Sequence, residues 1–322
     1  MDRALVIGGT RFLGRRLVTR LLANDYDVTI FNRGKHDNPF ADREGVSHVE
    51  GDRQSSAALE AAREAVEPDI VVDCVAYYPG EVEMATRVFS DVDAYVYVSS
   101  GSAYGPDVIP KREGETPLVP CSDEEAVDDS HDTYGARKAE GDRKVFEAAT
   151  NGVEAMSVRP TIVTGPYDYT GRFAYWVERV REYDRVLVPG DGTNIHHLVA
   201  VENVARAIVT VAEAGCAGEA YNVGDRQLLA LGDLVDGIAD AVGTTVEQVY
   251  ASERELGDLS AATFPLYTPT PHILSTEKLA GLGWDPISVE TAIEQAVADP
   301  SDPERDPGPD RETAAAILDR LS

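Results

Sequence analysis

Positive charge is scarce in this sequence. Its 322 residues include 57 Asp and Glu but only 29 Lys and Arg, so the formal net charge at pH 7 is −28. A nucleic-acid-binding protein normally carries a basic patch, and no basic block occurs here, so that class is disfavoured. Attraction to an anionic membrane surface is disfavoured for the same reason.

The excess of negative charge also bears on stability. Like charges in such numbers destabilise a compact chain through mutual repulsion. That repulsion is weak when the Debye length shrinks to about 3 Å, at roughly 1 M salt. We therefore interpret the composition as halophilic, an adaptation to a salty cytoplasm. The alternative is an ordinary acidic protein.

Cysteine and long apolar runs are rare as well. Cys74, Cys121 and Cys216 lie too far apart for a zinc or redox pair, so we expect no metal site, and their odd number suits a reducing compartment. The N-terminus is charged and leads directly into an apolar run, which is not typical of a signal peptide. The longest uncharged stretch, residues 259–276, contains three prolines and indicates a loop. The sequence thus predicts a soluble cytoplasmic protein.

Apolar residues make up 43% of the chain, which is sufficient for a packed core. In the first half, short apolar runs alternate with segments of helical periodicity. The expected strands are residues 4–7, 28–31, 46–49, 70–75, 94–98 and 153–158. The expected helices are residues 12–23, 55–66, 80–90 and 133–150. This alternation predicts an α/β fold with a Rossmann-type, doubly wound parallel sheet.

The second half is less regular and predicts a smaller α/β lobe. Its expected elements are helices at 173–183, 202–214 and 231–242 and a strand at 186–188. We expect three parts in the chain: a dinucleotide-binding domain over 1–165, with its sheet completed by later segments; a substrate-binding lobe over 166–298; and an acidic, proline-rich linker with a C-terminal helix over 299–322.

A glycine-rich turn follows the first expected strand and opens the first helix. Glycines at this place let the backbone approach a pyrophosphate, which binds at the helix N-terminus. Arg11 stands at the middle glycine of GxxGxxG and adds a positive charge beside the phosphates. The alternative is a tight turn without a ligand. The turn consists of Gly8, Gly9, Thr10, Arg11, Phe12, Leu13 and Gly14.

The end of the second expected strand bears on the choice of cofactor. An acid at this place binds the ribose 2′-hydroxyl of NAD, whereas an arginine accepts the 2′-phosphate of NADP. Here Asn32 and Arg33 are followed by Lys35, and no acid occurs before Asp37, so nothing there would repel a 2′-phosphate. This favours NADP over NAD, unless Arg33 makes only a surface ion pair. Asp52, after the third strand, could accept from the adenine amino group.

Two segments carry residues suited to acid–base chemistry. Tyr134 and Lys138 are four residues apart, so they share one face of the expected helix. An ammonium group near a phenol favours the phenolate and lowers the pKa of the phenol. Upstream, a strand ends in Ser99, Ser100 and Ser102, at the sheet edge where ligands bind. A hydroxyl there could share the substrate oxygen with Tyr134, although serines also form turns.

The glycine loop, the serine-ended strand and the Tyr-x-x-x-Lys motif, in this order, resemble the extended short-chain dehydrogenase/reductase superfamily, the NAD-dependent epimerase/dehydratase family. The resemblance continues through residues 159–166, 201–205 and 221–224, and covers about residues 3–297. The segments GGTRFLG and FNRGK are similar to those of the branch that contains chloroplast stem-loop-binding proteins.

This resemblance implies an NAD(P)-dependent epimerase or reductase acting on a carbinol of a sugar or sugar nucleotide. Tyr134 would act as the acid–base, Ser100 would position the oxygen, and Lys138 would tune Tyr134. The resemblance and the motifs together give a set of residues expected to bind the cofactor. They are Gly8, Gly9, Thr10, Arg11, Phe12, Leu13, Gly14, Asn32, Arg33, Lys35, Asp52, Arg53, Ala76, Ser99 and Pro160.

Departures from the family pattern bear on the substrate. The family's 4,6-dehydratases place Asp-Glu after the catalytic hydroxyl residue, where this chain has Gly101 and Ser102, so we do not expect a dehydratase. His196 stands where epimerases commonly offer the substrate diphosphate an arginine, unless it is simply a strand residue. The candidate substrate residues are Ser102, Arg172 and His196, with Arg159 as a substitute anion ligand.

The resemblance also implies a homodimer formed by the helices near residues 80–90 and 133–150. Val82, Ala85, Val88 and Phe89 would then be shared between the subunits. A competing interpretation of the whole chain is a non-catalytic dinucleotide-sensing or RNA-associated protein, as some relatives are. The intact Ser–Tyr–Lys set argues against a pure sensor, and the charge of −28 argues against RNA.

Overall fold

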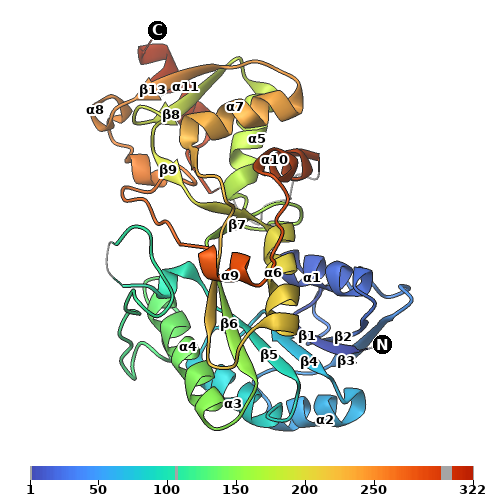
Figure 1. Ribbon diagram of the computed structural model, residues 1–322. Helices are drawn as coiled ribbons and strands as arrows, with labels where there is room; N and C mark the ends of the chain where they lie inside the picture. The colour runs from blue at the N-terminus through green and yellow to red at the C-terminus, as the bar shows by residue number, and fades with distance from the viewer. Residues whose placement is uncertain (1, 106–107, 299–306, 322) are drawn as a thin grey trace. The chain divides into compact units, whose positions relative to one another are not determined.

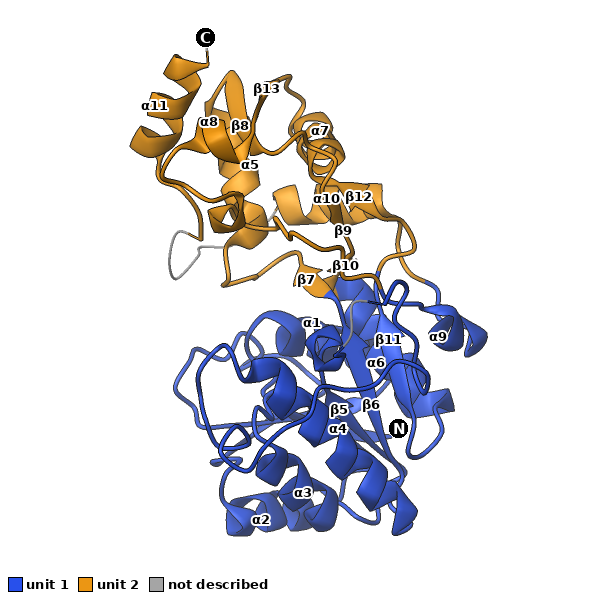
Figure 2. Ribbon diagram, turned by 90° about the vertical axis from the view of Figure 1, so that its left-hand side faces the viewer, with its two compact units in different colours: residues 1–161, 202–224, 274–285 blue, residues 162–201, 225–273, 286–322 orange. Residues whose placement is uncertain are grey.

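The computed structural model describes residues 2–105, 108–298 and 307–321. The chain divides into two compact units (Figure 2). Unit 1 comprises Met1–Thr161, Glu202–Gly224 and Leu274–Asp285. Unit 2 comprises Ile162–Val201, Asp225–Ile273 and Pro286–Ser322. Unit 1 therefore includes two segments from the second half of the chain. Residues 299–306 of the expected linker lie outside the described residues.

Unit 1 is built on a parallel sheet of seven strands in its described residues, in the order β11-β6-β5-β4-β1-β2-β3 (Figure 1). The strand order reverses between β1 and β4, and ligands bind such folds at this switch point. The prediction of a Rossmann-type, doubly wound sheet is confirmed. The strands are β1 (Arg3–Ile7), β2 (Asp27–Asn32), β3 (Val46–Glu50), β4 (Ile70–Asp73), β5 (Ala94–Val98), β6 (Ala155–Pro160) and β11 (Ala220–Val223).

Helices cover both faces of this sheet. On one face α2, α3 and α4 bury Leu59, Val82 and Val145 against Leu5 and Phe31 of the strands, whereas α1 and α6 lie on the other (Figure 1). The helical elements of unit 1 are α1 (Phe12–Ala23), α2 (Ser56–Val66), α3 (Pro79–Val88), the 3-10 turn η1 (Gly101–Ala103), α4 (Tyr134–Thr150), α6 (Val201–Ala214, which begins at the unit boundary) and α9 (Glu277–Gly281).

Unit 2 has its own core and, in its described residues, three two-stranded pairings: β7 with β10 and β8 with β13 are parallel, and β9 with β12 is antiparallel. Its strands are β7 (Ile162–Thr164), β8 (Arg185–Pro189), β9 (Ile195–His196), β10 (Leu198–Ala200), β12 (Leu229–Ala230) and β13 (Glu247–Ala251). Its helical elements are α5 (Arg172–Glu182), α7 (Leu231–Val242), α8 (Glu253–Leu256), the 3-10 turn η2 (Ala261–Thr263), α10 (Val289–Ala298) and α11 (Arg311–Arg320). The C-terminal helix α11 packs into this core through Ile317, which belongs to the same hydrophobic cluster as Trp176 and Phe264.

The four apolar residues that we expected at a subunit interface are buried in one chain. Val82, Ala85 and Phe89 have no exposed surface, and Val88 is 8% exposed. They pack in the core between α3 and the sheet, so they cannot also be shared with a second subunit. The interface assignment of these four is wrong, and the homodimer itself stays a prediction. None of the helices in the described part of the chain has the length and apolar composition of a membrane span.

Candidate active site

The turn between β1 and α1 has a backbone that requires glycine. Gly8 adopts a φ of 93°, which side chains other than glycine rarely adopt. A Cβ at Gly14 would lie 2.0 Å from the carbonyl oxygen of Gly8, so the helix can approach the turn this closely only without a side chain. Arg11 is the N-cap of α1, and Phe12 begins the helix. This cradle at a helix N-terminus fits a pyrophosphate.

Asn32 ends β2 with an amide group that is only half satisfied. Its Oδ1 accepts from the backbone N–H of Gly34 at 2.8 Å and lies 3.1 Å from a ring nitrogen of His48. Its Nδ2 is buried and has no hydrogen-bond partner among the described residues. An unused donor at this place fits a ribose oxygen of a dinucleotide.

The same corner holds a carboxylate that the sequence analysis missed. Glu50 on β3 is in register with Asn32 on β2. Its carboxyl carbon lies 3.1 Å from where a Cβ of Gly34 would be. Arg33 and Lys35 are exposed, and Arg33 makes no ion pair within the described residues. The expectation that nothing here would repel a 2′-phosphate is therefore wrong, because the neighbouring strand supplies an acid.

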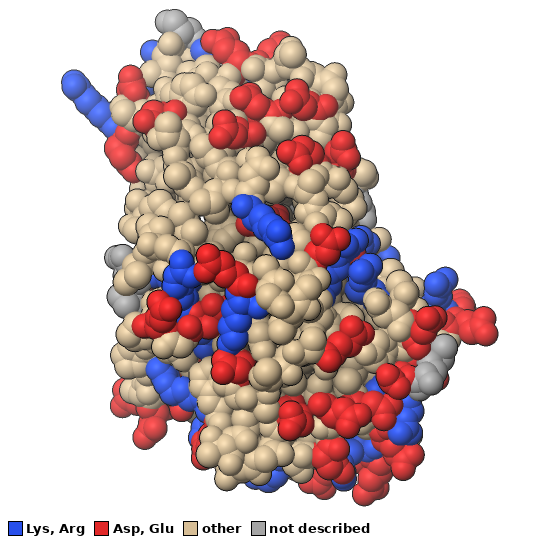
Figure 3. Space-filling model, viewed as in Figure 1, with Lys and Arg blue, Asp and Glu red and all other residues tan. Residues whose placement is uncertain are grey.

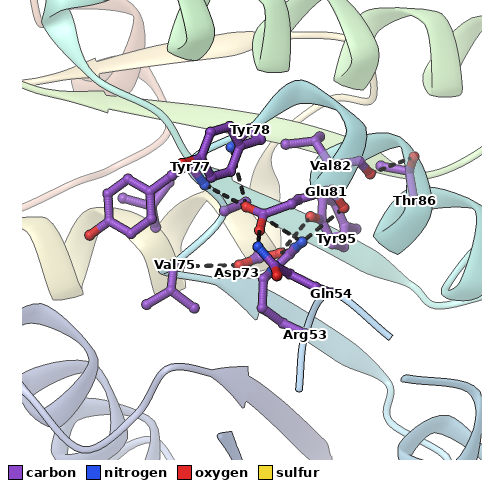
Figure 4. A network of polar contacts seen from close by, with 12 residues as sticks. Arg53, Gln54, Asp73, Val75, Tyr77, Tyr78, Glu81, Val82, Thr86 and Tyr95 are labelled. Atoms are coloured by element: carbon purple, nitrogen blue, oxygen red, sulfur yellow. Dashed lines mark hydrogen bonds and ion pairs between the residues drawn. The ribbon is translucent and has the colours of Figure 1, made fainter. Parts of the chain in front are cut away.

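A buried polar network joins the loop after β3 to β4, β5 and α3 (Figure 4). Arg53 forms an ion pair with Asp73, and its Nη1 lies 3.7 Å from Oε2 of Glu81. The Tyr95 hydroxyl donates to Asp73 at 3.2 Å. The side chain of Arg53, which we expected at the cofactor, is thus directed inward, so only its main chain is left for such a contact. Asp52 accepts from the backbone N–H of Gln54 at 3.0 Å.

The network also fixes the loop that follows β4. Asp73 accepts from the backbone N–H of Val75 at 3.2 Å, and Glu81 accepts from those of Tyr77 and Tyr78 at 2.8 and 3.2 Å. Ala76 lies in this loop and is completely buried. Its carbonyl group is consequently held in place as an acceptor for Lys138.

Lys138 is 2% exposed. Its Nζ donates to the carbonyl oxygens of Ala76 at 2.7 Å and Val98 at 2.9 Å, and lies 5.8 Å from the ring centroid of Tyr134. Burial lowers the pKa of Lys138 to about 8. Since an ammonium group has three donors, two are fixed by the backbone and one remains for a ribose or a phenol oxygen.

The serine-ended strand and the start of α4 meet closely. A Cβ at Gly135 would lie 2.5 Å from the carbonyl oxygen of Ser102, so the glycine lets Tyr134 sit next to η1. The Ser100 Oγ accepts from the backbone N–H of Ser102 at 3.1 Å, which leaves its own proton available. The start of α4 thus packs on the turn that carries Ser100 and Ser102, with Gly135 as an unpredicted contributor. The catalytic roles of Ser100, Tyr134 and Lys138 stay predictions.

Two further predicted residues lie near this segment. The Ser99 Oγ is buried without a partner in the described chain, which leaves it free for a ligand. Pro160 ends β6 and is buried.

Arg159 has a structural role instead of the substrate role that we expected. It is 2% exposed; its Nε donates to Asp142 at 2.8 Å, and its Nη1 donates to the hydroxyl of Tyr104 at 2.8 Å. That hydroxyl donates in turn to Asn222 at 2.9 Å. Because its guanidinium is buried and paired with Asp142, Arg159 is not a substitute anion ligand.

An open pocket of about 330 Å³ lies beside Tyr134 in unit 1. The ring of His131 is stacked on that of Tyr134, with centroids 6.3 Å apart and an interplanar angle of 12°. Sequence reasoning did not single out most of this lining, although the residues flank two predicted motifs. The lining residues are Tyr77, Tyr78, Asp129, Ser130, His131, Tyr134 and Arg137.

Unit 2 carries the other two substrate candidates. Arg172 begins α5, and its Nε donates to Thr170 at 3.1 Å. His196 is 2% exposed, and neither ring nitrogen has a partner in the described part of the chain. It borders a cavity of about 10 Å³ together with Thr164, Asp225 and Gln227. Burial lowers the pKa of His196 to about 4, so the ring is neutral at pH 7 and cannot replace the charge of an arginine.

The chain resembles one known family and several individual proteins in sequence. The profile of the NAD dependent epimerase/dehydratase family matches residues 4–224. The chloroplast stem-loop binding protein of 41 kDa b from Arabidopsis thaliana is 26% identical over 298 residues, which cover 88% of this chain and 75% of the relative. A putative UDP-glucose 4-epimerase from Methanocaldococcus jannaschii is 25% identical over 325 residues, 91% of this chain and 96% of the relative.

Solved structures share the fold. dTDP-glucose 4,6-dehydratase from Bacillus anthracis, in complex with NAD, superposes with a TM-score of 0.74 at 20% identity, covering 92% of this chain and 96% of that one. UDP-glucose 4-epimerase from Thermotoga maritima, with UDP-glucose, superposes with a TM-score of 0.72 at 22% identity, covering 92% and 97%.

Proposed function

Because the chain belongs to the NAD-dependent epimerase/dehydratase family of extended short-chain dehydrogenases/reductases, we propose that it is an NAD(P)-dependent epimerase or reductase of a sugar or sugar-nucleotide carbinol. The observation that supports this proposal is the position of Tyr134: its neighbour Gly135 packs on the carbonyl oxygen of Ser102, and the buried ammonium of Lys138 lies 5.8 Å from its ring centroid. A bound nicotinamide would supply the hydride acceptor.

The side chains then have the following roles. Tyr134 takes the proton of the substrate hydroxyl through its phenol oxygen. Ser100 donates its free proton to the same substrate oxygen and steadies its charge. Lys138 keeps a positive charge near Tyr134 below a pH of about 8, which favours the phenolate. The carbonyl groups of Ala76 and Val98 keep this ammonium in place.

The cofactor is a nicotinamide dinucleotide, and we propose that NADP binds more tightly than NAD. Support comes from Arg33, which is exposed and without an ion pair in the described residues. Glu50 opposes the preference, since its carboxylate lies beside Gly34. We therefore expect the preference for NADP to be modest, about tenfold at most.

We also propose that the enzyme is not a 4,6-dehydratase, although relatives of both kinds match the chain. Gly101 and Ser102 offer no carboxylate at the place where those enzymes have Asp-Glu. Ser102, Arg172 and His196 remain the proposed substrate residues, with His196 in its neutral form. We further propose a cytoplasmic homodimer that binds neither membrane nor nucleic acid.

The experiment is incubation with NAD⁺ or NADP⁺ and a panel of UDP-, GDP- and dTDP-sugars. Reduced nicotinamide is followed by its absorbance, and products are separated by chromatography. We expect an epimer or an oxidised sugar and no dehydrated product. Tight dinucleotide binding without turnover of any sugar would instead favour the dinucleotide-sensing or RNA-associated alternative.

A further inference from the structure

A buried guanidinium without a carboxylate partner lies beside Tyr134. Arg137 is 4% exposed. Its Nη2 donates to the carbonyl oxygen of Ser130 at 2.9 Å, and its Nη1 to that of Tyr77 at 3.4 Å. Its Nε has no hydrogen-bond partner in the part of the chain that is described. Buried charges are normally paired with an opposite charge, so this one lacks its usual partner.

The residues around Arg137 leave its charge available to a ligand in the adjacent pocket. Arg137 borders the open pocket that also contains Tyr134 and Asp129, and its guanidinium carbon lies 5.0 Å from the ring centroid of Tyr78. Nearby Asp128 is used by the loop itself, because it accepts from Ser130 and from Thr133. Within the described residues Arg137 forms no ion pair, and the charge of Asp128 acts on it only from beyond ion-pair distance.

We propose that Arg137 binds a carboxylate of the substrate, next to the carbinol that Tyr134 deprotonates. The inference rests on the proposed function, since it places the substrate at Tyr134. It narrows the substrate class to a sugar with a carboxylate near the reacting hydroxyl, as in a uronate. The planar guanidinium matches a carboxylate in shape and charge.

The geometry of α4 and the charge of the pocket favour this ligand. Tyr134 and Arg137 are three residues apart, so they are neighbours on one helix face, with Cβ atoms about 5–6 Å apart. A hydroxyl and a carboxylate on neighbouring carbons of one sugar ring can reach both side chains. A diphosphate carries more negative charge than this single guanidinium can neutralise, whereas one carboxylate matches it.

The test compares two ligands that differ only in the carboxylate, UDP-glucuronate and UDP-glucose. Their dissociation constants are measured by titration calorimetry on the protein saturated with its dinucleotide. We expect UDP-glucuronate to bind about tenfold more tightly or better. Equal affinities, or a preference for UDP-glucose, would overturn the proposal.

Arg137→Gln is the informative variant, and Arg137→Lys is its control. The first should abolish the preference while leaving UDP-glucose affinity within about twofold, whereas the second should keep part of the preference because it keeps the charge. Arg137 also donates to the carbonyl oxygens of Ser130 and Tyr77, so its replacement removes two hydrogen bonds that hold these loops. An equal loss of affinity for both ligands would assign Arg137 to holding these loops and overturn the proposal.

A different result separates this inference from the proposed function. If the dinucleotide binds but neither UDP-sugar does, the proposed sugar-nucleotide substrate fails. Free D-glucuronate and D-glucose then test the carboxylate site by saturation-transfer NMR on wild type and Arg137→Gln. A saturation-transfer signal from glucuronate that is present with wild type and lost with Arg137→Gln supports the carboxylate site. Equal signals from glucuronate and glucose with wild type overturn the proposal.

Discussion

Lys138 carries its charge in a buried position, and this environment determines what it can do for its neighbours. Its ammonium has the rings of Tyr97 and Tyr77 at 4.9 and 5.1 Å as well as that of Tyr134. Tyrosine faces attract a cation, and the Ala76 and Val98 carbonyls accept two of its protons. The lysine therefore stays in place whether or not a dinucleotide is bound, with one donor left for the reaction.

We predict that Lys138→Met changes how stability depends on pH. Burial lowers the pKa of Lys138 from 10.5 to about 8, so between these values the unfolded chain holds a proton that the folded chain has released. The wild-type free energy of unfolding should therefore rise with pH across this interval, and the variant should lack that rise. Urea unfolding at several pH values measures it, and identical slopes in both proteins would contradict the assignment.

The same variant has a functional readout. Without the ammonium, the phenol of Tyr134 loses a charge that favours its ionised form. Activity should therefore need a higher pH, and the dinucleotide should bind more weakly. A pH profile that did not move would leave Lys138 with a purely structural role.

At the level of elements, the close contact between η1 and α4 determines the geometry of the candidate active site. Gly135 permits it, because a Cβ there would lie 2.5 Å from the Ser102 carbonyl oxygen. We predict that Gly135→Ala pushes Tyr134 away from Ser100 and lowers turnover strongly, at a cost of about 1–3 kcal/mol in stability. Dinucleotide affinity, measured in parallel, should change little. Unchanged turnover would show that the spacing of the two elements does not matter for the chemistry.

The register of β2 and β3 leads to a prediction about the cofactor. It places Glu50 beside Gly34, near Arg33. Arg33→Ala should weaken NADP binding by about tenfold and leave NAD nearly unchanged, and Glu50→Gln should strengthen NADP binding by removing a repulsive charge. Fluorescence titration with both dinucleotides at high salt measures these constants. Equal binding of NAD and NADP to wild type, or NADP affinity unaffected by Arg33→Ala, would exclude the preference for NADP.

Much of the element layout can be predicted from sequence periodicity. The helices α1 and α7 and the strand β5 begin and end where the pattern predicts. The two-residue strands β9 and β12 are too short to show a period, and α10 and β13 lay in a stretch without clear alternation. In the site, the motifs predict Ser100, Tyr134 and Lys138. Glu50 and Arg137 were not predicted, because their surroundings depend on strand register and on contacts with the distant Tyr77 carbonyl, which only the tertiary structure reveals.

For the whole molecule, the dominant feature is negative charge. Acidic side chains are spread over the face shown in Figure 3, and several of the arginines lie next to them. Exposed ion pairs of this kind contribute little to stability, so they do not offset the repulsion from a net charge of −28.

We therefore predict that the melting temperature rises as KCl increases toward roughly 1 M, where the Debye length is about 3 Å. Scanning calorimetry or circular dichroism at a series of KCl concentrations measures this. Sucrose at matched osmolality serves as the control for effects that do not depend on charge. Stability that fell as KCl rose would contradict the halophilic interpretation.

The central claim is that this chain is a nicotinamide-dependent catalyst that uses Tyr134. The most direct measurement compares turnover of the sugar substrate by wild type and Tyr134→Phe, each saturated with dinucleotide. Loss of the phenol oxygen removes the acid–base while the ring stays, so turnover should fall by about a hundredfold or more, and the dissociation constant of the dinucleotide should stay the same. Equal turnover by the two proteins would contradict the claim.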